Sequence, residues 1–170
     1  MGILAGWRYC PRCAAGLQVA PDHLFCSSCG EQYWAGSVPG IQGILERDGR
    51  VLLARRAREP RRGYWDLPGG FLDEAETPAD GLRREFLEET GLEVEPVTLL
   101  RIDIEPYGDR HVFSVSWLVR DVDPGREPHA ADDVDEVRWF GRDELPEEVA
   151  FPGQQLVLRE WAGRSAGPTR

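Results

Sequence analysis

The sequence predicts an α/β domain preceded by a small cysteine-rich module. Two apolar segments within GIQGILERDGRVLLARRA meet at Asp48-Gly49, a dipeptide favoured in tight hairpins. A helical pattern runs from Thr77 to Gly91, and two further strand-like segments follow, VTLLRIDIE and HVFSVSWLV. All four cysteines lie in the first 29 residues. The expected parts are the module at 1–36, the α/β domain at 37–162 and a disordered tail at 163–170.

The composition is that of a soluble globular protein, with 170 residues, 41% hydrophobic and 29% charged. The sequence has no membrane-spanning apolar run and no convincing signal peptide, so we expect a cytoplasmic protein without a membrane partner. The net charge of −10 disfavours nucleic acid as a partner, because that affinity comes largely from basic groups. A small phosphorylated substrate is compatible with this charge when divalent ions bridge the two.

The cysteines form two pairs, Cys10-x-x-Cys13 and Cys26-x-x-Cys29. Each pair supplies two thiolates, and four thiolates complete the tetrahedral shell of a structural Zn²⁺ site. A redox role would more often show a single such pair, and disulfides are disfavoured in a reducing cytoplasm. The module has too little apolar bulk for its own core, so metal binding should drive its folding. It resembles a zinc ribbon, which implies a structural or dimerisation element or a binding module for nucleic acid or protein.

The stretch from Gly70 to Leu92 reads GFLDEAETPADGLRREFLEETGL. Thr77 is suited to cap a helix and Pro78 to its first position, and Gly91 is suited to end it. Leu82, Phe86 and Leu87 are expected on its buried side.

Three carboxylates share one face of this expected helix. Glu85, Glu88 and Glu89 stand at relative positions i, i+3 and i+4. Such a cluster repels itself unless a hard cation sits among the oxygens, and Mg²⁺ is commonly held by a few carboxylates, waters and substrate phosphates. The pattern therefore predicts a metal site that processes phosphates.

The segment before the helix offers candidate substrate contacts. Arg55 belongs to a basic run, RRAREPRR, that is either a solvated loop or a clamp for phosphates or a base. Tyr64 and Trp65 are candidates for stacking on a base, although an aromatic before a Pro-Gly turn is more often a core residue. The Gly69-Gly70 pair lets the backbone approach a ligand closely.

The stretch resembles the signature of the Nudix hydrolase family at every specified position. These positions are Gly70, Glu76, Arg84, Glu85, Phe86, Glu88, Glu89, Gly91 and Leu92. The resemblance implies an α/β/α sandwich with a mixed sheet over roughly residues 38–162. It also implies hydrolysis of a pyrophosphate linkage in a nucleoside diphosphate derivative, with Mg²⁺ or Mn²⁺ as cofactor. Family members often dimerise, so a homodimer is left open.

The resemblance also implies roles for individual residues. Glu85, Glu88 and Glu89 would hold the metal, with the Gly69 carbonyl as a further ligand. Glu85 would position or deprotonate the attacking water, with Arg84 orienting it. In this family the base can instead come from a loop before a late strand, where Glu136 is the leading candidate and Asp133 and Asp135 stand behind it.

The substrate is left open among several nucleotides. The arrangement of a zinc ribbon before such a domain is similar to that of the NADH pyrophosphatases. Those enzymes have an SQPWPFPxS stretch soon after the signature, whereas residues 93–107 here read EVEPVTLLRIDIEPY. ADP-ribose, dinucleoside polyphosphates and nucleoside triphosphates are the other candidates. The alternative function is that of a binding module, in which the zinc ribbon recruits RNA or protein on a catalytically weak Nudix scaffold. This alternative predicts that some signature residues are lost, but all of them are present in the sequence.

Overall fold

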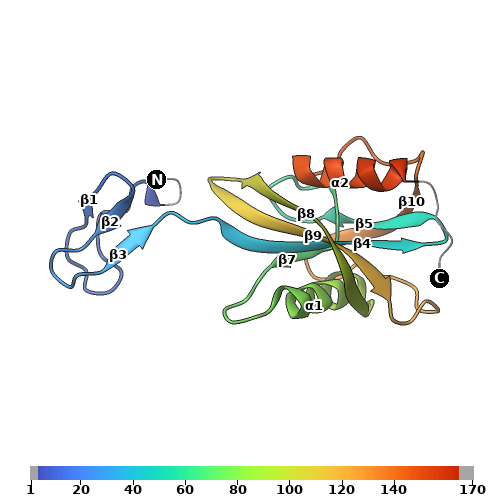
Figure 1. The fold of residues 1–170 in the computed structure, drawn as a ribbon, viewed down its shortest axis with the longest axis horizontal. Coiled ribbons are helices and arrows are strands. Elements are labelled where there is room, and N and C mark those ends of the chain that lie inside the picture. Colours follow the sequence, from blue (N-terminus) through green and yellow to red (C-terminus); the bar gives the residue numbers. More distant parts are fainter. Residues whose placement is uncertain (1–3, 165–170) are drawn as a thin grey trace.

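The computed structural model describes residues 4–164 and contains a small sheet, a large sheet and two helices (Figure 1). The small sheet belongs to the cysteine module, at the opposite end of the molecule from the β4–β5 hairpin. The elements are β1 (Gln18–Val19), β2 (His23–Phe25), β3 (Gln32–Trp34), β4 (Val38–Arg47), β5 (Arg50–Arg56), β6 (Trp65–Asp66), β7 (Gly69–Phe71), α1 (Pro78–Thr90), β8 (Val94–Tyr107), β9 (Arg110–Asp121), β10 (Val134–Gly141) and α2 (Pro152–Gly163).

The large sheet is mixed and lies between the two helices. Its main order is β10-β5-β4-β9-β8, with β6 added to β5 and β7 added to β4. The pairing of β4 with β9 is parallel, and the other pairings of these strands are antiparallel. Figure 1 shows α1 on one face of the sheet and α2 on the other. The α/β/α sandwich with a mixed sheet is therefore confirmed.

The hairpin between β4 and β5 turns where the sequence predicts. Asp48 and Gly49 have φ values of 50° and 74°, and both values lie in the left-handed region that a two-residue hairpin turn requires. The turn brings Glu46 opposite Val51 and extends the centre of the sheet.

The two helices bury separate apolar clusters. The α1 side contains Leu82 and Phe86 packed on Leu45 and Leu52, and the α2 side contains Leu158 and Trp161 among its buried residues. Each strand of the sheet interior therefore contributes to both faces, as alternating side chains should.

Two leucines expected in the core are exposed. The buried stripe of α1 follows Leu82, Phe86 and Glu89, at i, i+4 and i+7, and Leu87 lies off this stripe with 46% of its surface exposed. The apolar pattern of residues 153–162 likewise predicts a helix that buries Leu156, but in α2 Leu156 is 42% exposed and Leu158 is buried instead. Helical periodicity places both leucines away from the sheet, so these two burial predictions are wrong.

The C-terminal end differs slightly from expectation. Gly163 is the last residue of α2 and Arg164 follows as its C-cap, whereas residues 165–170 of the predicted disordered tail lie outside the described residues. Neither described helix is long and apolar enough to cross a membrane.

Candidate active site

The N-terminal and C-terminal ends of α1 are closed by the residues that the sequence indicates. Thr77 Oγ1 accepts a hydrogen bond from the Asp80 amide at 3.2 Å, and Pro78 occupies the first turn. At the other end Gly91 takes the left-handed conformation, with φ 70°, and its amide donates to the Leu87 carbonyl. These caps fix where the helix begins and ends, and therefore which way Glu85 and Glu89 point.

The two glycines before α1 bring the backbone against the helix carboxylates. Gly69 has φ 151°, and its amide donates a 2.9 Å hydrogen bond to Glu89 Oε2. A Cβ on Gly70 would lie 2.5 Å from Glu85 Oε1, so only glycine leaves room for this carboxylate. Strand β7 and α1 thereby form one rigid wall.

Arg84 is the hub of the ion pairs on this wall. Its Nε and Nη2 donate to the two oxygens of Glu76, each at 2.9 Å, a bidentate arrangement. Its Nη1 donates to Glu85 at 2.7 Å and to Glu88 at 3.1 Å. The Glu76 hydrogen bonds, with the neighbouring Glu85, raise the Arg84 pKa. Arg84 therefore stays charged and ties the loop before α1 to the helix.

Glu89 is a buried carboxyl group beside the pocket. It is 7% exposed, and burial raises its pKa well above its ordinary value, an effect increased by the charges of Asp66, Asp133 and Glu85. Burial also raises the pKa of Glu85, although Arg84 works against it. Two partly desolvated carboxylates of like charge favour a cation or a proton between them.

The three helix carboxylates do not converge as closely as the spacing suggested. Glu85 and Glu88 are both drawn to Arg84, while Glu89 turns to the Gly69 amide. Glu88 points outward, and it is absent from the residues that line the pocket. Within residues 4–164, only the cysteine sulfurs come within 4.8 Å of one another as a potential metal cluster.

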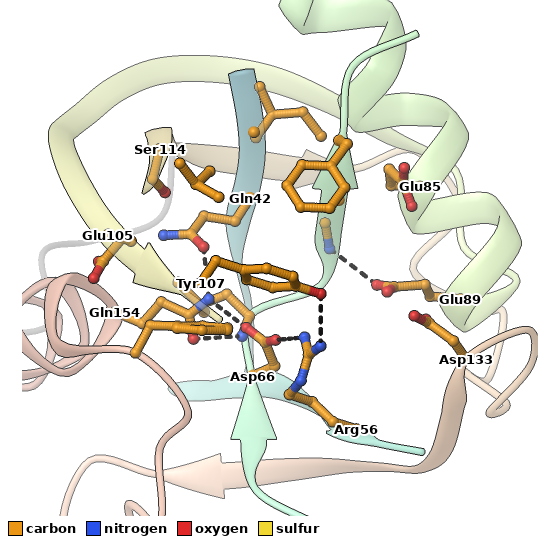
Figure 2. Close-up of a pocket in the computed structure, with 18 of the residues that line it drawn as sticks. Gln42, Arg56, Asp66, Glu85, Glu89, Glu105, Tyr107, Ser114, Asp133 and Gln154 are labelled. Atoms are coloured by element: carbon orange, nitrogen blue, oxygen red, sulfur yellow. Dashed lines mark hydrogen bonds and ion pairs between the residues drawn. The ribbon is translucent and has the colours of Figure 1, made fainter. Parts of the chain in front are cut away.

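A cavity of about 310 Å³ opens beside α1. Figure 2 shows Glu85, Glu89 and Asp133 along one side of it and Gln42, Ser114 and Glu105 toward the other. The lining residues come from both helix layers and six strands of the sheet, as the set Gln42, Arg56, Asp66, Phe71, Glu85, Tyr107, Ser114 and Gln154 illustrates.

A buried polar network holds Arg56 in this cavity. Its Nη1 donates to Asp66 at 2.6 Å, and its Nη2 donates to the Tyr107 hydroxyl at 3.2 Å. Gln154 donates to Asp66 and, at 2.6 Å, to Gln42. With its donors fixed in this way, Arg56 presents a pre-organised positive charge in the cavity that Glu85 and Glu89 also line.

Aromatic rings form part of the cavity wall. Tyr107 stacks on Phe151 with ring centroids 5.6 Å apart, and Phe71 meets Tyr107 edge-on at 5.2 Å. The Arg56 guanidinium lies 5.3 Å from the Phe151 ring centroid. The wall therefore combines flat apolar surface with one cation, which suits a base or a sugar next to a phosphate.

The three expected substrate contacts lie outside the cavity lining. Trp65 packs edge-on against Phe140 in the core at 8% exposure, and Arg55 forms ion pairs with Asp135 and Glu136. Tyr64 is half-buried under the Arg61 guanidinium. As substrate contacts these three residues stay predictions, whereas Arg56 and Tyr107 line the cavity.

Strand alternation could have indicated Arg56. Leu52, four residues before Arg56 on β5, packs on the α1 side of the sheet, whereas Leu53 packs on the α2 side. Because side chains alternate between faces, Arg56 shares the α1 side and Arg55 the opposite side. Nothing in the sequence indicated Gln154 or Asp66, which reach the cavity only through the tertiary fold.

The three candidate carboxylates in and after the loop before β10 lie in different places relative to the cavity. Glu136, the leading sequence candidate, pairs with Arg55 at 2.8 Å and also with Arg138, and it is not part of the cavity lining. Asp135 is bound to Arg55 Nε at 2.7 Å. Asp133 lines the cavity, and Figure 2 shows it beside Glu89.

The cysteine module contains two loops of the same construction. The Cys10 carbonyl accepts from the Ala14 amide and the Cys26 carbonyl from the Gly30 amide, each at 2.8 Å. The sulfurs of Cys10 and Cys29 are 3.6 Å apart and those of Cys13 and Cys26 3.5 Å apart. A tetrahedral zinc with Zn–S distances of about 2.3 Å requires roughly 3.8 Å between sulfurs. The four thiols are therefore arranged to hold such an ion.

One neighbour favours the thiolate form of this cluster. The Tyr33 hydroxyl lies 3.1 Å from Cys10 Sγ, and this hydrogen bond lowers the pKa of Cys10 to about 6. Deprotonated thiols are the form that binds metal.

Fold and site together define an α/β/α hydrolase in which an acidic helix faces a small-molecule pocket. The family model of the NUDIX domain matches residues 37–161, and the chain belongs to this family of hydrolases. Nudix enzymes typically use Mg²⁺ or Mn²⁺. Carboxylates such as those of Glu85 and Glu89 are the ligand type that these ions prefer.

The relatives include proteins of more than one activity. An ADP-ribose pyrophosphatase from Methanocaldococcus jannaschii is 35% identical over 121 residues, 69% of each chain. An NAD-capped RNA hydrolase, NudC, from Chromobacterium violaceum is 29% identical over 150 residues, 82% of this chain and 52% of that protein. The chain thus spans about half the length of the NudC proteins it matches. A solved NUDIX hydrolase from Nitrosomonas europaea superimposes with a TM-score of 0.80 at 26% identity, covering 92% of this chain and 90% of that one.

Proposed function

We propose that this protein hydrolyses the pyrophosphate of a nucleoside diphosphate derivative of the ADP-ribose or NADH type. The observation that carries the proposal is that a single cavity is lined by the carboxylates of Glu85, Glu89 and Asp133 and also by Arg56 and Tyr107. A substrate of this class has a pyrophosphate that could lie beside the three carboxylates and a sugar or base that could lie beside Arg56 and Tyr107. Similarity to an ADP-ribose pyrophosphatase and to NudC proteins supports this class.

The proposed metal ligands are Glu85, Glu88 and Glu89 with the Gly69 carbonyl, joined by Asp133. The buried, mutually repelling carboxylates fit Mg²⁺ or Mn²⁺, because a hard cation removes the electrostatic penalty of their charges. When bound, the ion neutralises charge on phosphate oxygens and makes a water molecule more acidic. Glu88 would reach the ion by turning from Arg84 while Arg84 keeps its bidentate partner Glu76.

The chain's own residues orient the reactants. Arg56, held by Asp66, would bind a phosphate oxygen away from the metal side, and Tyr107 would offer its ring to the sugar or base. Glu85 would position or deprotonate the attacking water, and Arg84 would hold Glu85 in place. Asp133 is the competing base, since it lies in the cavity and Glu136 does not.

A substrate panel tests the proposal. It contains ADP-ribose, NADH, NAD-capped RNA, dinucleoside polyphosphates, nucleoside triphosphates and nucleotide sugars, each assayed with Mg²⁺ and with Mn²⁺. Glu89→Gln should lower kcat on the preferred substrate by at least about a hundredfold. Glu74→Gln, an exposed change in the same signature loop, is the matched control and should keep wild-type rates. Absence of turnover on the whole panel would contradict the proposed function.

The two candidate bases are separated by their pH profiles. Whichever of Glu85→Gln and Asp133→Asn removes the acidic limb of the kcat profile identifies the base, because that limb reports its protonation. If both variants have a lower kcat but keep the acidic limb of the pH profile, neither carboxylate is the base.

We propose that Cys10, Cys13, Cys26 and Cys29 bind a structural Zn²⁺. The distances between their sulfurs support it. Protein purified without added metal should contain about one zinc per chain, and a Cys26→Ser variant should contain much less. Equal zinc content in the two proteins would contradict the assignment.

A further inference from the structure

The loop that brings Asp133 into the cavity is fastened to the C-terminal end of α1. This loop, residues 122–133, connects β9 to β10. The His129 amide donates to the Thr90 carbonyl at 3.0 Å, and the Ala131 amide donates to the Glu89 carbonyl at 3.1 Å. Carbonyls in the last turn of a helix lack partners within it, so the loop satisfies them and is held by them.

The His129 ring seats directly on Gly91. A Cβ on Gly91 would lie 2.0 Å from His129 Cε1 and 2.6 Å from Nδ1. Any other L-residue at position 91 would therefore displace the imidazole. Gly91 has two separate reasons to be glycine: its φ of 70° ends α1, and its bare Cα receives the His129 ring.

Further backbone hydrogen bonds connect this part of the loop to Asp133. The Val134 amide donates to the Ala131 carbonyl at 3.1 Å, and Asp132, inside this turn, has φ 51°. The Ala57 amide donates to the Asp133 carbonyl at 2.8 Å. Asp133 is thus held between a turn fixed to α1 on one side and Ala57, the residue after β5, on the other, and its side chain lies at the cavity with Glu89.

We propose that His129 is a positioning residue: its ring, seated on Gly91, fixes the loop so that Asp133 stands at a set distance from the carboxylates of the catalytic helix. Without the ring, the loop keeps its two backbone hydrogen bonds to α1 but loses its side-chain contact with Gly91. The inference rests on the proposed function, because the role of Asp133 is defined by that reaction.

A double-mutant cycle between His129 and Asp133 tests the inference. His129→Ala should lower kcat on the preferred substrate about tenfold with little change in KM, because a displaced catalytic group affects the chemical step more than binding. In the Asp133→Asn background the same change should have almost no further effect. Glu127→Ala, an exposed change in the same loop, is the control and should keep the wild-type kcat.

Rescue separates packing from proton transfer. His129→Phe keeps a flat ring over Gly91 without a titratable nitrogen, and it should restore most of the kcat lost in His129→Ala. A Phe variant as slow as the Ala variant would overturn the inference, since it would make the imidazole nitrogen the important feature.

A second cycle examines the seat itself. Gly91→Asn should still fold, because asparagine tolerates the left-handed conformation, yet it should lower kcat by displacing the ring. The added loss should be smaller when His129 is already Ala. Equal losses in both backgrounds would mean that Gly91 serves only to end the helix.

Failure of this inference is distinguishable from failure of the proposed function. A wild-type protein without activity on the substrate panel contradicts the function. An active wild type with a fully active His129→Ala or Asp133→Asn variant, or with an undiminished His129→Ala effect in the Asp133→Asn background, overturns the inference and leaves the function standing.

Discussion

The buried carboxyl of Glu89 should make the stability of the Mg²⁺-free protein depend on pH. Burial, with the nearby charges of Asp66, Asp133 and Glu85, raises its pKa in the folded state, whereas the unfolded chain exposes it to water. The folded state therefore binds a proton more tightly. Its contribution to stability is fully present below the unfolded pKa and is lost as the pH rises from that value toward the folded one.

The size of the effect follows from proton linkage. Between the two pKa values the unfolded state has released one proton that the folded state keeps, so the free energy of unfolding falls by up to about 1.4 kcal/mol per pH unit. For a chain of this length that corresponds to a melting temperature lower by roughly 3–6 °C per unit. Glu89→Gln cannot lose this proton, so its advantage over wild type should grow as the pH rises above about 4.3.

Thermal unfolding of both proteins without Mg²⁺, at half-unit steps from pH 5 to 8, measures the difference. Glu88→Gln, one residue earlier on the exposed side of α1, is the matched control and should run parallel to wild type. Added Mg²⁺ should raise the melting temperature of wild type more than that of Glu89→Gln. Parallel curves for wild type and Glu89→Gln across this range would refute the reasoning.

Three further changes test other parts of the molecule. Phe86→Ala should lower the free energy of unfolding by about 3–5 kcal/mol in urea titrations, because its side chain is fully buried under α1; a loss below about 1 kcal/mol would contradict that packing. Glu76→Gln should lower kcat about tenfold by breaking the bidentate pair with Arg84, as steady-state kinetics would measure, and an unchanged kcat would count against Arg84 as the hub of the site. Cys26→Ser should lose zinc but keep kcat within about twofold, since the described strands of the cysteine module pair only with one another; a large loss of kcat in folded protein would place the module at the active site.

Much of the local structure was predictable because its causes are local. Thr77, Pro78 and Gly91 set the ends of α1 through their own hydrogen bonding and φ preferences. Asp48-Gly49 set the hairpin in the same way. The spacing of the four cysteines was enough to predict that their sulfurs meet.

The cavity was less predictable because neighbouring residues on a strand point to opposite faces. Arg55 and Arg56 are the same residue type in the sequence, and Arg56 alone of the two lies in the cavity, because the tertiary fold sets which face of β5 borders it. Similarly, Glu136 forms an ion pair with Arg55 outside the cavity lining, whereas Asp133 lines the cavity.

The sequence by itself determined the family signature, the acidic helix with its caps and the cysteine pairs, since each depends on residue type and short spacing. The tertiary structure decided which charged groups face one another. Burial gives Glu89 its raised pKa, and Asp66 with Tyr107 orients Arg56. The contact of His129 with Gly91 joins segments almost forty residues apart along the chain. These properties arise from desolvation and long-range packing, which a one-dimensional pattern does not encode.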